Sequence, residues 1–247
     1  MIRPVVTLPT AEAAAAADLF GAAVLVLDVQ RATTTLAWAF ENGATMAFVA
    51  ADIPAALRLA DEWSHAGVLL CGERGGRKIP GFDLGNSPLE YTREAVGGRP
   101  LVFSSTNGSR ALLAARACER LGLGALVNAR AAALWAAAGP EPLVLLCSGK
   151  EGEENEEDLL GAGAILAELE GLGEAPRLDP TSRRALSMFR SAEAGLEAAV
   201  ARCEHAVYLA REGFGADLKV AAALNSLRRV PEWESGRLGP GREWPQR

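Results

Sequence analysis

The feature that most constrains the fold of this chain is a pattern of three consecutive segments, which repeats along roughly the first 170 residues. A short apolar run is followed by a polar loop and then by an amphipathic stretch, about six times over. Such alternation is typical of a mostly parallel sheet with helices on both faces. We therefore expect an α/β fold with three α/β/α layers and a mostly parallel or mixed sheet. The predicted strands are Val5–Leu8, Val24–Leu27, Ala47–Ala50, Val68–Cys71, Leu101–Ser104, Ala125–Asn128 and Leu143–Cys147, and the predicted helices are 11–20, 35–42, 53–65, 110–121, 129–138 and 158–170.

The pattern changes from about Pro180, where the predicted strands stop and only helices follow. We expect helices at 181–200, continuing to about 212, and at 216–228. Residues 231–247 are polar and rich in Pro and Gly, which predicts a tail on the surface. No linker divides the chain convincingly, so we expect one α/β domain over residues 1–247, with a helical part at 180–230 and a polar tail at 231–247.

Composition excludes several kinds of partner. The net charge of −6 argues against nucleic acid, because phosphate backbones require a basic surface. The four cysteines show no C-x-x-C pairing, which disfavours thiolate metal sites and disulfides. No apolar run approaches ~20 residues and the N-terminus has no signal-peptide pattern, so we expect a cytoplasmic protein without a membrane partner. The sequence leaves open whether the chain is a homo-oligomer.

The segment Gly72–Pro88 (GERGGRKIPGFDLGNSP) is predicted to be a long, ordered loop. It has neither the strand nor the helix period, and loops of this length in compact domains are usually functional or disordered. The spaced apolar residues Ile79, Phe82 and Leu84 favour order. We expect the loop to bring backbone amides, cations and carboxylates to a small anion; a flexible surface loop is the alternative.

Two more polar turns come directly after predicted strands and before predicted helices. The first, DVQRATTT at 28–35, contains Asp28, Arg31, Thr33 and Thr34. The second, SSTNGS at 104–109, offers small hydroxyl groups and a glycine. Helix N-termini present free N–H groups and a positive dipole end to anions, so both turns suit a phosphate. Ordinary helix capping, with Asp28 and Arg31 paired to each other, is the alternative.

The acidic loop at 149–158 has six acids in its last eight residues, which is typical of a solvated loop. Asp158 is the last of these acids before the helix, where it can face the strand ends as a catalytic or metal-binding group. His205 lies in a predicted helix, and its role as a general base or a core residue stays open. Asp217 follows a glycine turn and is a candidate N-cap.

Oxygen donors without a His or Cys cluster favour Mg²⁺ over Zn²⁺. One or two carboxylates beside phosphate-binding cations are the usual setting for phosphoryl chemistry. The chain contains no GxxxxGK[ST] motif, which disfavours an ATPase, and no GxSxG motif, which disfavours an α/β-hydrolase esterase.

These motifs resemble the 2-phosphosulfolactate phosphatase family. The resemblance spans about 190 residues and rests on VLVLDVQRATTT, GERGGRKIPGFDLGNSP, STNGS, the segment Glu157–Gly163 and the segment from His205 to Asp217. It implies an α/β enzyme that needs Mg²⁺ and hydrolyses phosphate esters of 2-hydroxycarboxylic acids. The name of the family refers to the step from 2-phospho-3-sulfolactate to 3-sulfolactate in coenzyme M biosynthesis. The substrate is then a small phosphorylated anion.

The resemblance also implies a set of site residues. It places in the site Asp28, Arg31, Thr33, Thr34, Glu73, Arg74, Asp83, Asn86, Ser87, Thr106, Asn107 and Gly108. It also matches Asp158 and Asp217 to acidic positions of the family. One departure is Gln30, which stands where the family more often has Leu.

Physical inference assigns roles to these residues. We expect Asp28, Asp83 and Asp158 to hold the metal, with Glu73 as another candidate, and Arg31 and Arg74 to stabilise charge on the phosphate. Arg77 and Lys78 are candidates for a second acid group of the substrate, with surface solvation as the alternative. Direct attack by water is favoured over an aspartyl-phosphate, because Gln30 occupies the place of the second Asp in a D-x-D motif. A non-catalytic binder of phosphorylated metabolites is the alternative function.

Overall fold

The computed structural model describes residues 3–245, and these form one sheet of eleven strands. The strands are β1 (Pro4–Leu8), β2 (Ala23–Leu27), β3 (Met46–Val49), β4 (Leu69–Arg74), β5 (Arg77–Lys78), β6 (Pro100–Ser104), β7 (Arg120–Gly124), β8 (Leu143–Cys147), β9 (Arg177–Leu178), β10 (Glu232–Glu234) and β11 (Arg237–Gly239). Their order across the sheet is β5-β4-β6-β3-β11-β10-β7-β2-β8-β1-β9.

Most neighbouring strands of the sheet are parallel, which confirms the predicted α/β class. β2 pairs in parallel with β7 and β8 through the register Leu25↔Gly122 and Leu25↔Leu145. β4, β6 and β3 form a second parallel group, and in the described part of the chain every antiparallel strand pair involves β5, β10 or β11. The sheet is therefore mixed, with the antiparallel strands confined to two hairpins.

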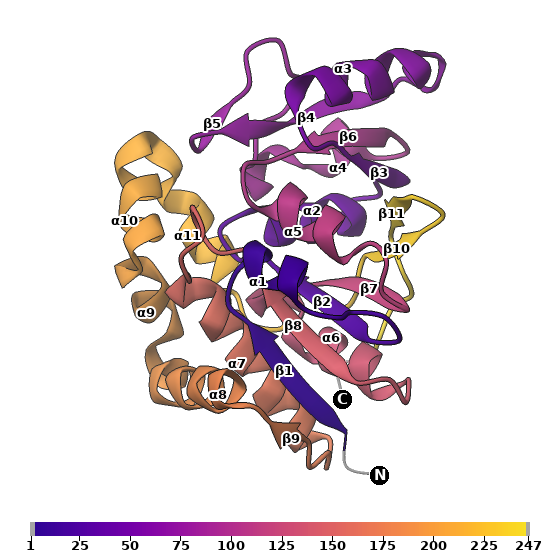
Figure 1. Cartoon of the computed structure of the whole chain (residues 1–247). Helices are drawn as coiled ribbons and strands as arrows, with labels where there is room; N and C mark the ends of the chain where they lie inside the picture. Colours follow the sequence, from indigo (N-terminus) through magenta and orange to yellow (C-terminus); the bar gives the residue numbers. More distant parts are fainter. Residues whose placement is uncertain (1–2, 246–247) are drawn as a thin grey trace.

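Helices cover both faces of the sheet, as Figure 1 shows. They are α1 (Ala11–Ala16), α2 (Ala32–Glu41), α3 (Ile53–Glu62), α4 (Arg93–Val96), α5 (Gly108–Ala115), α6 (Ala129–Ala137), α7 (Glu156–Gly171), α8 (Pro180–Ala192), α9 (Leu196–Arg202), α10 (Glu204–Leu209) and α11 (Gly215–Ala221).

The alternation of side chains along β2 produces two cores. Leu25 and Leu27 pack with α6, α7 and the helices after it, whereas Val24 and Val26 pack with α1, α2 and α5. Side chains along a strand point alternately to opposite faces, so an entirely apolar strand such as β2 must be covered on both sides. The predicted three layers follow directly from this.

The helix starts follow capping chemistry. Thr10 and Asp52 accept hydrogen bonds from the backbone N–H groups of Ala13 and Ala55, as Thr and Asp commonly do at the N-cap position. The helix ends are less well predicted: α1 ends at Ala16 rather than 20, and α11 ends at Ala221 rather than 228.

The predicted surface tail is wrong, because residues 232–239 form a hairpin inside the sheet. This C-terminal hairpin, β10 and β11, lies between β7 and β3 and joins them through the pairs Glu232↔Gly122 and Leu238↔Ala47. Leu238 is fully buried, and Trp244 beyond the hairpin is also buried. The hairpin thus connects two half-sheets, β5-β4-β6-β3 and β7-β2-β8-β1-β9, which do not pair with each other directly.

Two other predictions of local structure are also wrong. The helix predicted at 110–121 ends at Ala115. The strand predicted at Ala125–Asn128 lies earlier in the chain, where β7 covers Arg120–Gly124. The segment Gly72–Pro88 is not wholly a loop, since β4 continues to Arg74 and turns back into β5. The turn is made by Gly75 and Gly76, both with positive φ.

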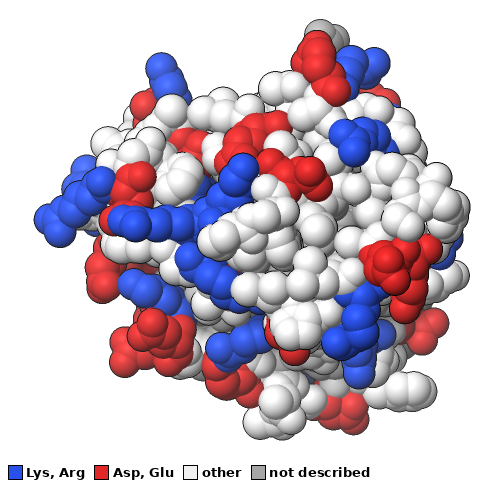
Figure 2. All heavy atoms as spheres, turned by 90° about the horizontal axis from the view of Figure 1, so that it is seen from above, with Lys and Arg blue, Asp and Glu red and all other residues white. Residues whose placement is uncertain are grey.

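The carboxyl ends of β2, β4, β6 and β8 lie along one edge of the sheet. The helices after Pro180, shown in orange and yellow in Figure 1, form an arm that passes beside this edge. From the α3 end of the molecule, Figure 2 shows acidic and basic side chains interspersed on the surface. Between residues 3 and 245, no helix is long and apolar enough to cross a membrane.

Candidate active site

The turn between β2 and α2 places Asp28 at the carboxyl end of a central strand. The carboxylate is almost fully buried and accepts a hydrogen bond from the N–H of Ala32, at 3.2 Å from Oδ1. Thr33 Oγ1 accepts the backbone N–H of Asp28 at 3.0 Å. Burial raises the pKa of Asp28 to about 6, opposed by the bond from Ala32 and helped by the charge of Glu73. The free N-terminal end of α2 therefore stabilises this carboxylate only in part.

Gly108, at the start of α5, lies directly against Asp28. A Cβ atom at this position would be 2.5 Å from the Cβ of Ala32 and 2.7 Å from Asp28 Oδ2. The backbone of Gly108 also hydrogen-bonds the Asp28 carboxylate. A glycine is required here because the N-terminus of α5 lies against the carboxylate that follows β2.

Glu73, at the end of β4, connects two loops of the site. Its Oε2 accepts the N–H of Gly76 at 2.7 Å, and its Oε1 accepts the N–H of Thr106 at 2.7 Å. The side chain is buried. One carboxylate thus fixes the β4–β5 turn and the turn after β6 beside each other.

Arg31 pairs with Asp217 and not with Asp28, so the alternative of an Asp28–Arg31 pair is wrong. Its Nη1 is 2.9 Å from Asp217 Oδ2, and its Nη2 donates to the carbonyl of Gly76 at 2.6 Å. Both charged side chains are almost fully buried, and the Arg31 guanidinium lies 4.1 Å from the ring centroid of Phe214. Ser87 Oγ donates to the other oxygen of Asp217 at 2.6 Å. This pair attaches α11 to the β2–α2 turn.

Asp158 supports the site from behind. Its Oδ1 accepts the N–H of Val29 at 2.8 Å, and its Oδ2 accepts the hydroxyl of Ser148 at 3.0 Å. Burial, together with the charge of Asp28, raises the pKa of Asp158 well above its usual range. The carboxyl group joins the ends of β2 and β8, and it does not line the pocket.

These loops enclose a cavity of about 300 Å³ between the strand ends and the helical arm. It is lined by Asp28, Gln30, Arg31, Glu73, Gly75, Gly76, Asn86, Thr106, Asn107, Lys150, Glu151, His205 and Tyr208. In α/β folds, ligands bind at this edge of the sheet. The lining comes from both half-sheets and from the arm.

Several buried polar atoms of the cavity wall lack a hydrogen-bond partner within residues 3–245. They are both amide atoms of Gln30, Oδ1 of Asn86 and Nδ1 of His205. Burial and the charge of Lys150 lower the pKa of His205 to about 4, so the ring is neutral at pH 7. Buried polar groups are normally paired, and a group of unpaired ones around a cavity indicates a ligand.

The structure brings about half of the predicted site residues to the cavity wall. Asp28, Arg31, Glu73, Asn86, Thr106 and Asn107 line it, whereas Thr33, Thr34, Ser87, Gly108 and Asp158 lie behind it. Arg74 and Asp83 are not brought there. Arg74 donates to Ser104 Oγ at 2.8 Å, and Asp83 is exposed and accepts the N–H of Leu70 at 2.8 Å.

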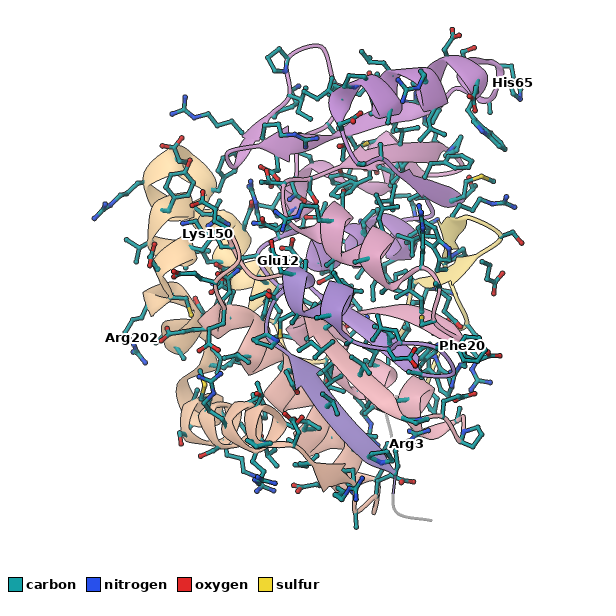
Figure 3. All side chains as sticks on the ribbon, viewed as in Figure 1. Arg3, Glu12, Phe20, His65, Lys150 and Arg202 are labelled. Carbon is teal, nitrogen blue, oxygen red and sulfur yellow. The ribbon has the colours of Figure 1, made fainter. Side chains whose placement is uncertain are left out.

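Arg77 and Lys78 also lie outside the cavity. Arg77 pairs on the surface with Glu212, and Lys78 donates to the carbonyl of Asp83. The cation that sequence reasoning missed is Lys150, which Figure 3 shows on a loop between the arm and the strand ends. Tyr208 was missed too; its hydroxyl donates to the carbonyl of Gly75 at 2.8 Å. The only sequence signal was their proximity to motifs at 149–158 and at His205.

The carboxylates do not form a metal site by themselves. In the described part of the chain, no three Asp, Glu, His or Cys side chains are grouped so as to hold a metal ion. The predicted set of Asp28, Asp83 and Asp158 is therefore not assembled. Asp28 and the unpaired Oδ1 of Asn86 are nevertheless hard oxygen donors in one cavity. Mg²⁺ is commonly held by one or two carboxylates, waters and a substrate phosphate, so this donor set fits Mg²⁺.

The mixed α/β sheet and the polar cavity at its carboxyl edge are typical of an enzyme that acts on a small anion. Comparison with known proteins gives the family. A sequence model described as 2-phosphosulpholactate phosphatase matches residues 9–236. The chain belongs to this family, and with it to the phosphatases.

Named relatives agree with this assignment. A protein of Deinococcus radiodurans is 40% identical over 223 residues, which cover 90% of this chain and 89% of the relative. A protein of Carboxydothermus hydrogenoformans is 39% identical over 220 residues, covering 89% and 88%, respectively. One of Caldanaerobacter subterraneus is 33% identical over 219 residues, covering 89% and 90%. Each of the three is named "Probable 2-phosphosulfolactate phosphatase".

Proposed function

We propose that the protein is an Mg²⁺-dependent phosphatase that hydrolyses phosphate monoesters of 2-hydroxycarboxylic acids, in particular 2-phospho-3-sulfolactate to 3-sulfolactate and phosphate. The observation that carries the proposal is the position of the Asp28 carboxylate, between the N-termini of α2 and α5 on the wall of a cavity. Helix N-termini favour anions, and a carboxylate beside them can act on a phosphate bound there.

Charge supports the need for a metal. Asp28 and Glu73 both face the cavity, and Arg31 is already paired with Asp217. A phosphate dianion would be repelled by two carboxylates at short range in a site of low dielectric. Mg²⁺ held by Asp28 and Asn86 would, when bound, neutralise the charge on the phosphate oxygens. Thr106 and Asn107, at the start of α5, then position the phosphate.

The chain's own residues supply the proton transfer. The oxygen of water forms a bond to phosphorus, the bond between phosphorus and the ester oxygen breaks, and Glu73, a second buried carboxylate of the cavity, takes the proton that water loses. The leaving alkoxide takes up a proton in turn, so the products are the hydroxy acid and inorganic phosphate.

Phosphate release tests the proposal. Release from 2-phospho-3-sulfolactate should require Mg²⁺, stop with EDTA, and be lost in Asp28→Asn, whose melting temperature should stay close to that of the wild type. Absence of release, combined with thermal stabilisation by the same ligand, would contradict the proposal and favour the non-catalytic binder.

The route of attack has its own test. Direct attack by water predicts no covalent intermediate. Acid quenching during a single turnover, followed by intact mass measurement, should find unmodified protein. A phosphoryl group on Asp28 would refute direct attack.

The cytoplasmic location and the link to coenzyme M stay predictions from the sequence.

A further inference from the structure

Gln30 presents an unused amide to the cavity. The residue is 4% exposed and lines the cavity, and both its Oε1 and its Nε2 lack a partner within the described residues. A buried amide that pairs with nothing in the protein is destabilising, so its retention indicates a partner that binds from outside.

Lys150 supplies a charge that forms no ion pair with a buried carboxylate between residues 3 and 245. Its Nζ is 3.6 Å from Glu204 Oε1, and Glu204 is 93% exposed, so this ion pair is weak. Among residues 3–245, the other cation that lines the cavity is Arg31, which is committed to Asp217 and Gly76. Lys150 is therefore the cavity cation left to bind an anion.

A chain of contacts places these two groups in the same part of the cavity, next to α10. The ring of His205 lies beside the backbone of Gln30 and stacks on Tyr208, with centroids 5.9 Å apart. Lys150 Nζ lies 5.9 Å from the centroid of the Tyr208 ring. Figure 3 shows Lys150 on this side, facing the arm.

We propose that Gln30 and Lys150 form a subsite for the second acid group of the substrate, a sulfonate, and that they discriminate for substrates that carry one. This inference rests on the proposed function. The carboxylates of Asp28 and Glu73 repel any anion that is not neutralised, so a second anionic group of the substrate is accepted where the cation lies. Gln30 Nε2 donates to a sulfonate oxygen, Lys150 provides the charge, and Gln30 Oε1 accepts from a water in the cavity.

Paired substrates test this subsite. We would compare kcat/KM for 2-phospho-3-sulfolactate with kcat/KM for 2-phospholactate, which has the same ester and no sulfonate. In Gln30→Leu and in Lys150→Met the ratio should fall by about tenfold or more, mostly through KM, because each change removes a hydrogen bond to a charged group. Lys150→Arg should restore much of the ratio. Arg77→Met, which removes a cation outside the cavity, should leave it unchanged.

An equal loss of kcat/KM for both substrates in Gln30→Leu and Lys150→Met would overturn the inference. Such a result would mean that the two side chains act on the phosphate or on folding, and not on the sulfonate. Calorimetric binding of 3-sulfolactate and of lactate, without metal, gives a second readout. Both variants should weaken binding of 3-sulfolactate more than binding of lactate, and equal weakening would again overturn the inference. A wild-type protein that hydrolyses neither ester refutes the proposed function, whereas the calorimetric difference between variants still decides the subsite.

Discussion

Replacing Asp217 with Asn removes the charge that pairs with Arg31 and leaves the shape of the side chain nearly unchanged. The two side chains are 3% and 2% exposed, and the Nη1 to Oδ2 distance is 2.9 Å. Removing one partner of a buried ion pair leaves the other charge uncompensated, which costs about 3–5 kcal/mol. We expect Asp217→Asn to lower the free energy of unfolding by this amount in equilibrium urea denaturation.

The surface pair of Arg77 and Glu212 is the matched control, because one of its side chains is 73% exposed. Glu212→Gln should cause no resolvable shift of the urea midpoint. The double variant Arg31→Met with Asp217→Leu removes both charges and should be more stable than Asp217→Asn alone. The reasoning fails if Asp217→Asn behaves like Glu212→Gln, or if the double variant is the least stable of the three.

Three further predictions concern the hairpin, the acidic loop and the turn after β6. Leu238→Ala should lower the free energy of unfolding by about 2–5 kcal/mol, since Leu238 is fully buried. Leu57→Ala, at a half-exposed position, should lower it far less. Equal urea midpoints for the two variants would contradict this. Burial raises the pKa of Glu157 from 4.5 to about 7, so the folded chain keeps a proton that the unfolded chain releases between these pH values. The free energy of unfolding should therefore fall as the pH rises through this window. Between pH 5 and pH 8, the unfolding free energy of Glu157→Gln should rise relative to that of the wild type by on the order of 2 kcal/mol. A difference between the two proteins that stays constant with pH in urea melts would contradict this. Gly108→Ala brings a methyl group against Asp28 and should reduce phosphate release by about tenfold or more, and an unchanged rate would show that the close approach is not needed.

The central strands could be predicted because they are short apolar runs bounded by polar turns. Strand β7 was missed because its sequence, RLGLG, has glycines where strands usually have β-branched residues. The structure explains them: a Cβ at Gly122 would be 2.9 Å from Val230 Cγ1, and one at Gly124 would be 2.9 Å from Ile165 Cδ1. Close packing on the face of the sheet covered by α6 and α7 overrides propensity here, and no local pattern reports it.

The C-terminal hairpin left a weak signal. Ser235 and Gly236 both have positive φ, as in a two-residue hairpin turn, and Trp233 pairs with Leu238 across it. Strands of three residues, flanked by prolines and charged residues, are too short to show the alternation of apolar and polar side chains that predicts a strand. Their burial depends on β3 and β7, which are distant in the sequence.

Half of the site followed from motifs, and the other half depends on long-range packing. Asp28 and Thr106 come directly after strands that the sequence predicts, at the strand ends where α/β folds bind ligands, so both could be named as candidates. Arg74 and Asp83 lie in the same motif as Glu73, but the β4–β5 turn directs them away from the cavity. Lys150 reaches it from the loop between β8 and α7, and Tyr208 reaches it from the arm, which the Arg31–Asp217 pair attaches to the β2–α2 turn.

The placement of the C-terminal hairpin has a consequence for synthesis of the protein. Asp28 belongs to one half-sheet and Glu73 to the other, and the strands that join the halves end at Gly239. A ribosome therefore makes Asp28, Glu73, Lys150 and His205 long before the chain can complete its sheet. We expect the two halves to stay unjoined on the ribosome, with a nascent polypeptide that carries its site residues and cannot yet use them.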